Sequence, residues 1–246
     1  MRKTKIVCTI GPASSDPKIF TEMCKAGLNV ARLNFSHGTH PEHLEKLNMI
    51  KKVREELNLP IAIMLDTKGP EYRIKTFEHG KIFLQDGDEF SFTTEDIVGN
   101  QSRVSVTYAG LVNDISIGDR ILVNNGLVIF EVIGKTDTDV KCRVITGGEL
   151  KNRKSMSFPN KVLNQVYLSE QDKEDLLFGI QNNVDYIAAS FVSRRQDLVD
   201  LKAFLRENGG DGIDIIAKIE NRTGIDNIEE ICEECDGIMI GRGDLC

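Results

Sequence analysis

The sequence predicts an α/β protein in which a parallel β-barrel is interrupted by an inserted all-β domain. Short apolar strands alternate with amphipathic helices in the first and last thirds of the chain, whereas the middle third contains only short strands separated by turns. The run at 61–65 is apolar throughout, as expected of a parallel strand that is covered on both faces. We count six strands of this kind, and a closed barrel of the TIM, or (β/α)8, type needs eight. The predicted barrel is therefore incomplete.

The first third of the chain predicts successive βαβ units. Apolar runs of strand length are separated by stretches with a helical period. We predict strands at 5–10, 29–35 and 61–66, and helices at 17–26 and 41–57.

The middle of the chain predicts the all-β domain. Short alternating runs lie between turn signals such as Asp86-Gly87, Asn125-Gly126 and Gly147-Gly148, and no segment has a helical period. The Asn-Gly pair is the strongest of these signals and predicts a β-hairpin. We predict strands at 81–84, 89–93, 103–107, 120–123, 127–132 and 140–145.

The helical period returns at Ser169, where a Ser or Asp cap precedes the acidic first turn of a helix that runs to about Gln181. Further helices are predicted at 196–208 and 225–232, and strands at 186–191, 213–219 and 237–240. The predicted domains are residues 1–70 as the first part of the barrel, 71–159 as the inserted β-barrel domain, and 160–246 as a second part of the barrel, truncated after its sixth strand.

The composition excludes several classes of protein. With 40% hydrophobic residues and a net charge of −7, the chain is typical of a soluble globular protein and is not expected to bind nucleic acid or an anionic membrane nonspecifically. It has no apolar run long enough to span a bilayer and no secretory signal, so we expect a cytoplasmic location. The six cysteines are scattered and are expected to be reduced thiols.

Polar side chains cluster on one face of the second predicted strand. Because side chains alternate along a strand, Arg32, Asn34 and Ser36 share one face, and Leu33 and Phe35 occupy the other. Unpaired polar groups are costly to bury, so this pattern indicates a ligand site. The alternative is that the strand end simply reaches solvent.

Two later segments also end apolar strands with charged residues. Lys218 and Glu220 share a face of their strand, and Asp244 follows in a turn with glycine spacing that includes Gly243. Taken singly, these features could be an ion pair and an ordinary turn. Together with Arg32 and Asp66, they fall at the carboxyl ends of parallel strands, the rim where barrel enzymes build their sites. Two carboxylates there, without His or Cys, favour Mg²⁺, with phosphate as its natural partner.

Five motifs in this order resemble the pyruvate kinase family. They lie at residues 5–12, 32–38, 65–71, 217–221 and 241–245, and the resemblance covers the whole chain. It implies glycolytic phosphoryl transfer from phosphoenolpyruvate to ADP, giving pyruvate and ATP, with the β domain closing over the active site as a lid. Without the rest of such a barrel, we expect the chain alone to have little or no activity. A complete chain would form a homotetramer.

The resemblance also implies site residues. Arg32 and Lys218 would be catalytic and bind the substrate, with Gly243 and Asp244 receiving the substrate carboxylate. Glu220 and Asp244 would hold Mg²⁺ or Mn²⁺. Glu71 matches the residue that accompanies a requirement for K⁺. The expected K⁺ ligands are Asn34, Ser36, Asp66 and Thr67, and the expected nucleotide contacts are Asn34, His37, Arg73 and Lys154.

This chain departs from the family pattern in three places. Residues 154–160 lack the usual glycines after the lid, Tyr72 replaces a smaller residue, and Cys246 stands where a glycine is usual. The last departure bears on carboxylate binding.

Two alternative functions remain open. One is a Mg²⁺-dependent barrel lyase or aldolase acting on a pyruvate-like enolate, and the other is a noncatalytic remnant. Two further motifs are given no metal role, because His40 and His43 are expected at the surface, and Cys232 and Cys235 are expected to be plain helix cysteines.

Overall fold

The computed structural model describes residues 3–159, 161, 163–164, 166–243 and 245. The chain divides into two compact units, which we describe separately. The first, called here the parallel-sheet unit, comprises Met1–Gly69, Tyr167–Ile219 and Asn227–Ile240. The second, called the β unit, comprises Pro70–Val166, Glu220–Asp226 and Gly241–Cys246.

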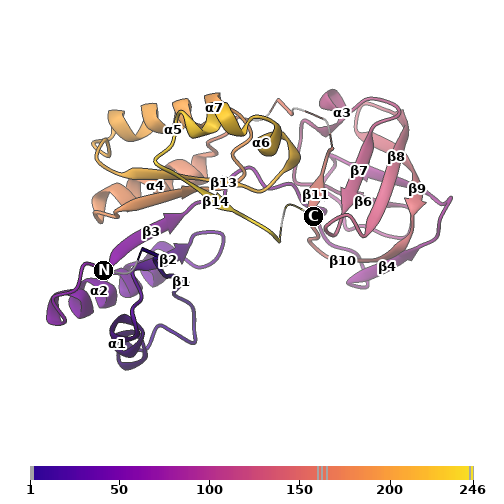
Figure 1. The fold of residues 1–246 in the computed structure, drawn as a ribbon. Helices are drawn as coiled ribbons and strands as arrows, with labels where there is room; N and C mark the ends of the chain where they lie inside the picture. Colours follow the sequence, from indigo (N-terminus) through magenta and orange to yellow (C-terminus); the bar gives the residue numbers. More distant parts are fainter. Residues whose placement is uncertain (1–2, 160, 162, 165, 244, 246) are drawn as a thin grey trace. The chain divides into compact units, whose positions relative to one another are not determined.

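The parallel-sheet unit is built on one six-stranded sheet (Figure 1). Every pair of neighbouring strands in it is parallel, and the α/β class predicted from the sequence is confirmed. In sheet order, the strands are β1 (Val7–Thr9), β2 (Val30–Asn34), β3 (Ala62–Asp66), β12 (Tyr186–Ala189), β13 (Asp214–Ile219) and β14 (Gly237–Ile240).

Helices α1 and α4 begin at side-chain caps, of which the cap at Ser169 was predicted. Asp16 accepts hydrogen bonds from the amides of Lys18 and Ile19 at the start of α1, and Ser169 forms a capping box with Asp172 at the start of α4. The bounds are α1 (Pro17–Ala26), α2 (His40–Glu56), α4 (Glu170–Gln181), α5 (Arg195–Glu207), α6 (Arg222–Asp226) and α7 (Ile228–Cys232). Within the described part of the chain, no helix has the length and apolar character needed to cross a membrane.

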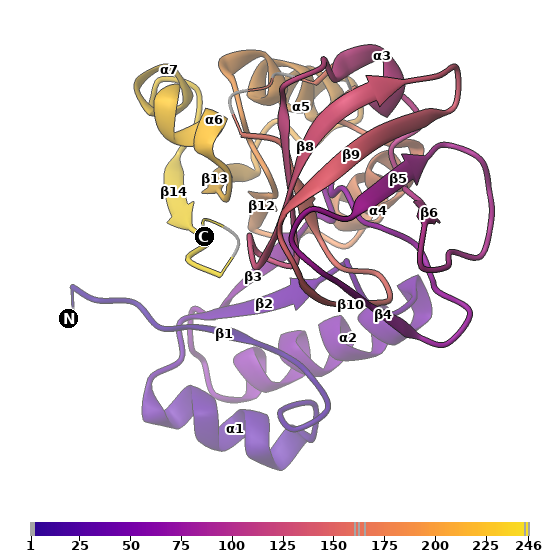
Figure 2. The same cartoon turned by 90° about the vertical axis from the view of Figure 1, so that its right-hand side faces the viewer.

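Helices cover the sheet because its strands are apolar on both faces. Figures 1 and 2 show α1 and α2 lying along one side of β1, β2 and β3. Leu33, Ile63, Leu65 and Ile187 in the sheet are fully buried, as is Phe20 of α1. This packing holds the carboxyl ends of the strands in a fixed register.

Several predicted elements end differently in the structure, and two of the differences have a clear local cause. The single helix expected at 225–232 is two short helices, α6 and α7, because the backbone at Asn227 leaves the helical region and its side-chain amide donates to the Ser193 carbonyl oxygen at 2.9 Å. Strand β12 stops at Ala189, two residues before the predicted end, because Phe191 takes a positive φ of 55°.

The β unit contains the remaining strands, which pair mainly antiparallel. The predicted Asn-Gly hairpin is confirmed between β7 and β8, with positive φ at Asn124, Asn125 and Gly126. Strands β10 and β11 and the short helix α3 (Leu111–Asp114) were not predicted. The strand bounds are β4 (Lys81–Leu84), β5 (Glu89–Thr93), β6 (Arg103–Ser105), β7 (Arg120–Val123), β8 (Val128–Lys135), β9 (Asp139–Thr146), β10 (Gly148–Lys151) and β11 (Met156–Ser157).

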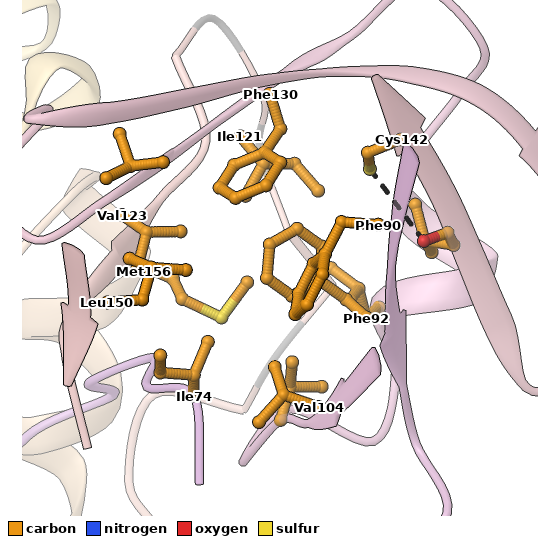
Figure 3. Packing of buried hydrophobic residues seen from close by; sticks show 14 of the residues in the cluster. Ile74, Phe90, Phe92, Val104, Ile121, Val123, Phe130, Cys142, Leu150 and Met156 are labelled. Carbon is orange, nitrogen blue, oxygen red and sulfur yellow. Dashed lines mark hydrogen bonds between the residues drawn. The ribbon is translucent and has the colours of Figure 1, made fainter. Parts of the chain in front are cut away.

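The β unit has its own hydrophobic core. Figure 3 shows the rings of Phe90, Phe92 and Phe130 packed together, with Met156 and Ile74 beside them. Phe92 and Phe130 meet edge to face at a centroid distance of 4.9 Å. A separate core of this kind is what lets a segment fold as a compact unit.

Candidate active site at the carboxyl edge of the parallel sheet

Parallel pairing brings the polar strand ends together. Thr9 of β1 lies opposite Arg32 of β2, and Asn34 at the end of β2 lies opposite Asp66 at the end of β3. Asp66 is in turn opposite Ala188 of β12. Residues from distant parts of the sequence therefore meet at one edge of the sheet.

Asp66 is the centre of this cluster and is only 1% exposed. Its Oδ1 atom lies 3.0 Å from Nζ of Lys218, and its Oδ2 atom accepts a hydrogen bond from Nε of Arg32. Arg32 also donates to the hydroxyl of Thr9. Two cationic side chains thus share one buried carboxylate, which leaves the three groups with a net positive charge suited to an anion.

Ser190 completes the cluster, although sequence reasoning did not select it. Lys218 Nζ donates to its Oγ atom at 2.7 Å, and this hydroxyl can donate either to Asp66 Oδ1 at 3.0 Å or to the Thr67 carbonyl oxygen at 2.6 Å. The Tyr167 hydroxyl donates to the Ser190 carbonyl oxygen at 2.8 Å. The available signal was a hydroxyl residue near the end of the apolar strand predicted at 186–191.

Gly69 allows the chain to pass close to Ser190. Its φ is +66°, and a Cβ atom there would lie 2.7 Å from the Ser190 carbonyl oxygen. Its amide donates to Oδ1 of Asp172, the buried capping residue of α4, at 3.1 Å. The glycine of the 65–71 motif therefore has a definite packing role.

The residues expected to bind K⁺ end two neighbouring strands. Asn34 Oδ1 accepts from the Ser36 amide at 3.0 Å, and the Ser36 side chain is exposed. Asp66 and Thr67 are buried at the end of β3. All four candidates supply oxygen atoms, which is the donor type that alkali cations require.

Glu220 follows β13 directly and is 5% exposed. Its side chain packs against the backbone of Gly241, where an added Cβ would lie 2.7 Å from Oε1. Gly243 is exposed in the same turn. Asp244, the second expected Mg²⁺ ligand, lies outside the described residues. Among those that are described, no group of three or more His, Cys, Asp or Glu side chains could hold a metal ion.

The nucleotide candidates Arg73 and Lys154 lie on adjoining segments of the β unit. Arg73 pairs antiparallel with Ser155, and the Ile74 amide donates to the Lys154 carbonyl oxygen at 3.0 Å. The Arg73 guanidinium forms an ion pair with Glu71. The two residues thus lie on adjacent segments within this unit.

The expectation for the histidines is wrong at His43. This residue is only 2% exposed, because its ring stacks on Phe35 at a centroid distance of 4.0 Å. His40 is partly exposed and pairs with Asp175 through an Nε2–Oδ1 contact of 2.6 Å. Cys232 ends α7, whereas Cys235 lies beyond the helix. His43 lies four residues before Leu47, on the buried stripe of α2 that continues through Ile50 and Val53, and this spacing was a signal that could have found its burial.

The model of the family described as "Pyruvate kinase, barrel domain" matches residues 1–246. The chain belongs to the pyruvate kinase family. It is 48% identical to the pyruvate kinase of Staphylococcus haemolyticus, 46% to that of Staphylococcus aureus strain MRSA252 and 45% to that of Bacillus licheniformis. Each similarity covers 100% of this chain.

The chain spans 42% of the length of these pyruvate kinase relatives. The family membership agrees with the resemblance seen in the five motifs. Three of the residues in those motifs, Arg32, Asp66 and Lys218, are the ones that the parallel sheet joins in the buried cluster.

Proposed function

We propose that this chain carries the substrate-binding and phosphoryl-transfer residues of a pyruvate kinase, which moves the phosphoryl group of phosphoenolpyruvate to ADP and yields pyruvate and ATP. The observation that carries the proposal is the cluster in which Arg32 and Lys218 share the buried carboxylate of Asp66. Its place at the carboxyl edge of a parallel sheet is typical of barrel active sites.

Arg32 and Lys218 are the proposed catalytic residues. In phosphoryl transfer, negative charge spreads over the equatorial oxygens of the transferred group, and fixed cations stabilise it. Lys218 would also neutralise the enolate oxygen that forms as pyruvate is released. Its position is held by Asp66 and Ser190, so little reorganisation is needed during the reaction.

Glu220 and Asp244 are the proposed ligands of Mg²⁺ or Mn²⁺, and the amides of Gly243 and Asp244 are proposed to receive the substrate carboxylate. The buried carboxylate of Glu220 is a hard oxygen donor of the type these ions prefer. A bound divalent ion supplies charge neutralisation on the phosphoryl oxygens.

K⁺ is the proposed monovalent cation, with Asn34, Ser36, Asp66 and the Thr67 carbonyl as its ligands. The proximity of Asn34 and Asp66 in the strand register supports this assignment. Glu71 is proposed to accompany the K⁺ requirement. The ion supplies positive charge near the site.

Asn34, His37, Arg73 and Lys154 are the proposed nucleotide contacts. We assign residues 71–159 as an inserted lid domain that excludes water during transfer, and residues 1–70 and 160–246 as parts of a (β/α)8 barrel of the TIM type. The separate core of the β unit supports this domain assignment.

The proposed partners are small molecules, and the proposed location is cytoplasmic. The net charge of −7 supports the absence of a nucleic-acid or anionic-membrane partner. A homotetramer is proposed for a family member of full length.

Isothermal titration of the chain with phosphoenolpyruvate, in the presence of Mg²⁺ and K⁺, tests the proposal. We expect binding by the wild type and an affinity at least roughly tenfold lower for Lys218→Met, since a charge-assisted contact is lost. Lys52→Met, at an exposed position on α2, is the matched control and should bind like the wild type. Equal affinity of Lys218→Met and the wild type would overturn the assignment.

A labelling experiment separates a kinase from a lyase or aldolase. A lyase has no use for a nucleotide, so only the kinase predicts that ADP protects Lys154 from an amine-reactive reagent. Protection by phosphoenolpyruvate but not by ADP would favour the lyase.

A further inference from the structure

The turn between β2 and α2, residues 36–39, carries two proposed ligand residues, Ser36 and His37. Both have exposed side chains. Few side-chain contacts therefore hold them directly, and the position of the turn depends on the hydrogen bonds and packing of its backbone. One end of the turn follows Phe35, whose amide donates to the Asp66 carbonyl oxygen at 2.9 Å.

His43, on α2, forms a hydrogen bond with the middle of this turn. Its Nε2 atom lies 2.9 Å from the His37 carbonyl oxygen. A carbonyl oxygen can only accept, so Nε2 must carry the hydrogen, and the neutral ring then has a bare Nδ1 atom. That Nδ1 atom is buried and has no hydrogen-bond partner among the described residues.

The turn is also packed tightly against the start of α2. Gly38 has a φ of +87°, and a Cβ atom there would lie 3.3 Å from His43 Nε2 and 3.2 Å from Glu42 Oε2. Glu42 accepts from the Thr39 amide at 2.7 Å and completes the capping box. His43 and Glu42 therefore hold adjacent peptide groups of one turn.

The ring of His43 is itself held in place. It stacks on Phe35 at an interplanar angle of 10°, and Phe35 lies against Phe178 of α4 at a centroid distance of 5.7 Å. His40 stacks on the same Phe178 ring and bonds to Asp175. His43 thus connects the turn to a fixed aromatic cluster made of Phe35, His40, His43 and Phe178.

We infer that His43 is a positioning residue whose Nε2–H group holds the His37 carbonyl and so fixes the turn that presents Ser36 and His37. The ring acts on ligands only through this turn and touches neither phosphoryl group nor metal. The consequence for ligand binding rests on the proposed function, because it takes Ser36 and His37 as ligand residues. The inference that His43 positions the turn does not depend on the proposed function.

Two NMR measurements on the full chain test the inference without any ligand. In the wild type, the ring ¹⁵N shifts of His43 should show the neutral Nε2–H tautomer, and the Nδ1–H tautomer would overturn the inference. In His43→Phe, which keeps a stacking ring but loses the donor, the amide signals of residues 36–39 should shift and exchange faster with solvent. A folded His43→Phe protein with unchanged signals in this turn would contradict the inference.

Two more variants complete the design. His43→Gln replaces the ring with an amide donor. If the donor role is correct, the amide signals of residues 36–39 in this variant should lie closer to those of the wild type than the signals of His43→Phe do. This variant also tests the donor role if His43→Phe does not fold. His43→Leu has no donor at this position. If the signals of the turn shift as much in His43→Gln as in His43→Leu, the donor role is wrong. Lys52→Met, at an exposed position further along the same helix, is the control and should leave the turn unchanged.

Titration with ADP then reports on the ligand roles. If the proposed function holds, His43→Phe should bind ADP roughly threefold to tenfold more weakly than the wild type, the effect of about one hydrogen bond. If the wild type binds no ADP, the proposed function fails, and the NMR result for the turn still stands. If the turn moves and ADP binding is unchanged, the consequence for ligand binding is wrong.

Discussion

Nζ of Lys218 lies 3.0 Å from Oδ1 of Asp66, although 152 residues separate the two in the sequence. Asp66 also accepts from Arg32, so one buried carboxylate organises both cations. Burial makes each of these contacts stronger than it would be in water and makes the loss of any one partner costly.

Asp66→Ala should be among the most destabilising substitutions in the chain. It leaves the Lys218 ammonium buried next to an empty space and removes the ion pair to Arg32. We expect a loss of about 3–5 kcal/mol in the free energy of unfolding, measured by urea denaturation. Asp96→Ala, which breaks the exposed pair with Lys75, is the control and should have no measurable effect. A similar midpoint for both variants would refute the prediction.

Ser190→Ala should weaken the cluster without removing a charge. Lys218 loses one acceptor, and either Asp66 or the Thr67 carbonyl oxygen loses a donor, so we expect a loss of about 1–3 kcal/mol in stability and weaker binding of phosphoenolpyruvate. Denaturation and isothermal titration measure the two effects. Ser15→Ala, at a half-buried position whose hydroxyl donates to the Pro12 carbonyl oxygen in a solvent-exposed hydrogen bond, should change neither. Unaltered affinity in Ser190→Ala would show that the hydroxyl does not position Lys218.

Gly69→Ala should destabilise the protein more than Gly87→Ala, although both positions have positive φ. The left-handed conformation costs about 1–2 kcal/mol at either position. At Gly69 alone, the new methyl group would also meet the Ser190 carbonyl oxygen, whereas nothing lies within 4 Å at Gly87. Thermal denaturation of the two variants provides the comparison. Equal losses of stability in the two variants would mean that the backbone conformation alone determines the destabilisation.

Stability should fall in mild acid because of His43. Burial lowers the pKa of His43 below the ordinary value of 6.5, against a smaller opposing effect of the hydrogen bond to His37. The unfolded state therefore binds this proton more readily, so the contribution of the neutral ring is present above pH 6.5 and is lost as the pH falls below it. The slope from this single group is at most about 1.4 kcal/mol per pH unit.

Urea denaturation as a function of pH measures this effect as the difference between the wild type and His43→Phe. The charged and titratable groups that face the ring are Lys46, Glu42 and His40 of α2 and Asp175 of α4. Identical pH dependence of the two proteins below pH 6.5 would contradict the assignment to His43.

Tyr108 should ionise only at strongly alkaline pH in the native state. Burial, followed by its hydrogen bond to Asp114, raises the pKa of Tyr108 well above the ordinary value of 10.0. The contribution to stability is full below pH 10 and is lost as the pH rises above it. The difference in phenolate absorbance between the wild type and Tyr108→Phe measures this titration. Ionisation of Tyr108 near pH 10 in the folded protein would disprove the prediction.

Local patterns were sufficient for most of the secondary structure. The cap at Ser169 and the Asn125-Gly126 hairpin act over a few residues, and the structure contains both as predicted. The break at Asn227 was missed because the acceptor of its side chain is Ser193, which is distant in sequence. The surface prediction for His43 was wrong although the residue lies four positions before Leu47, on the buried stripe of α2. Rings from β2 and α4 cover it there.

The sequence by itself determined which strands end in charged residues, because alternation along a strand and the apolar runs at 61–65 and 215–217 are local properties. Only the tertiary structure decided that Arg32 and Lys218 share Asp66, and that Ser190 joins them. The physical reason is that these contacts depend on strand order and register in the sheet. Both are set by packing between segments far apart in the chain, which no local period encodes.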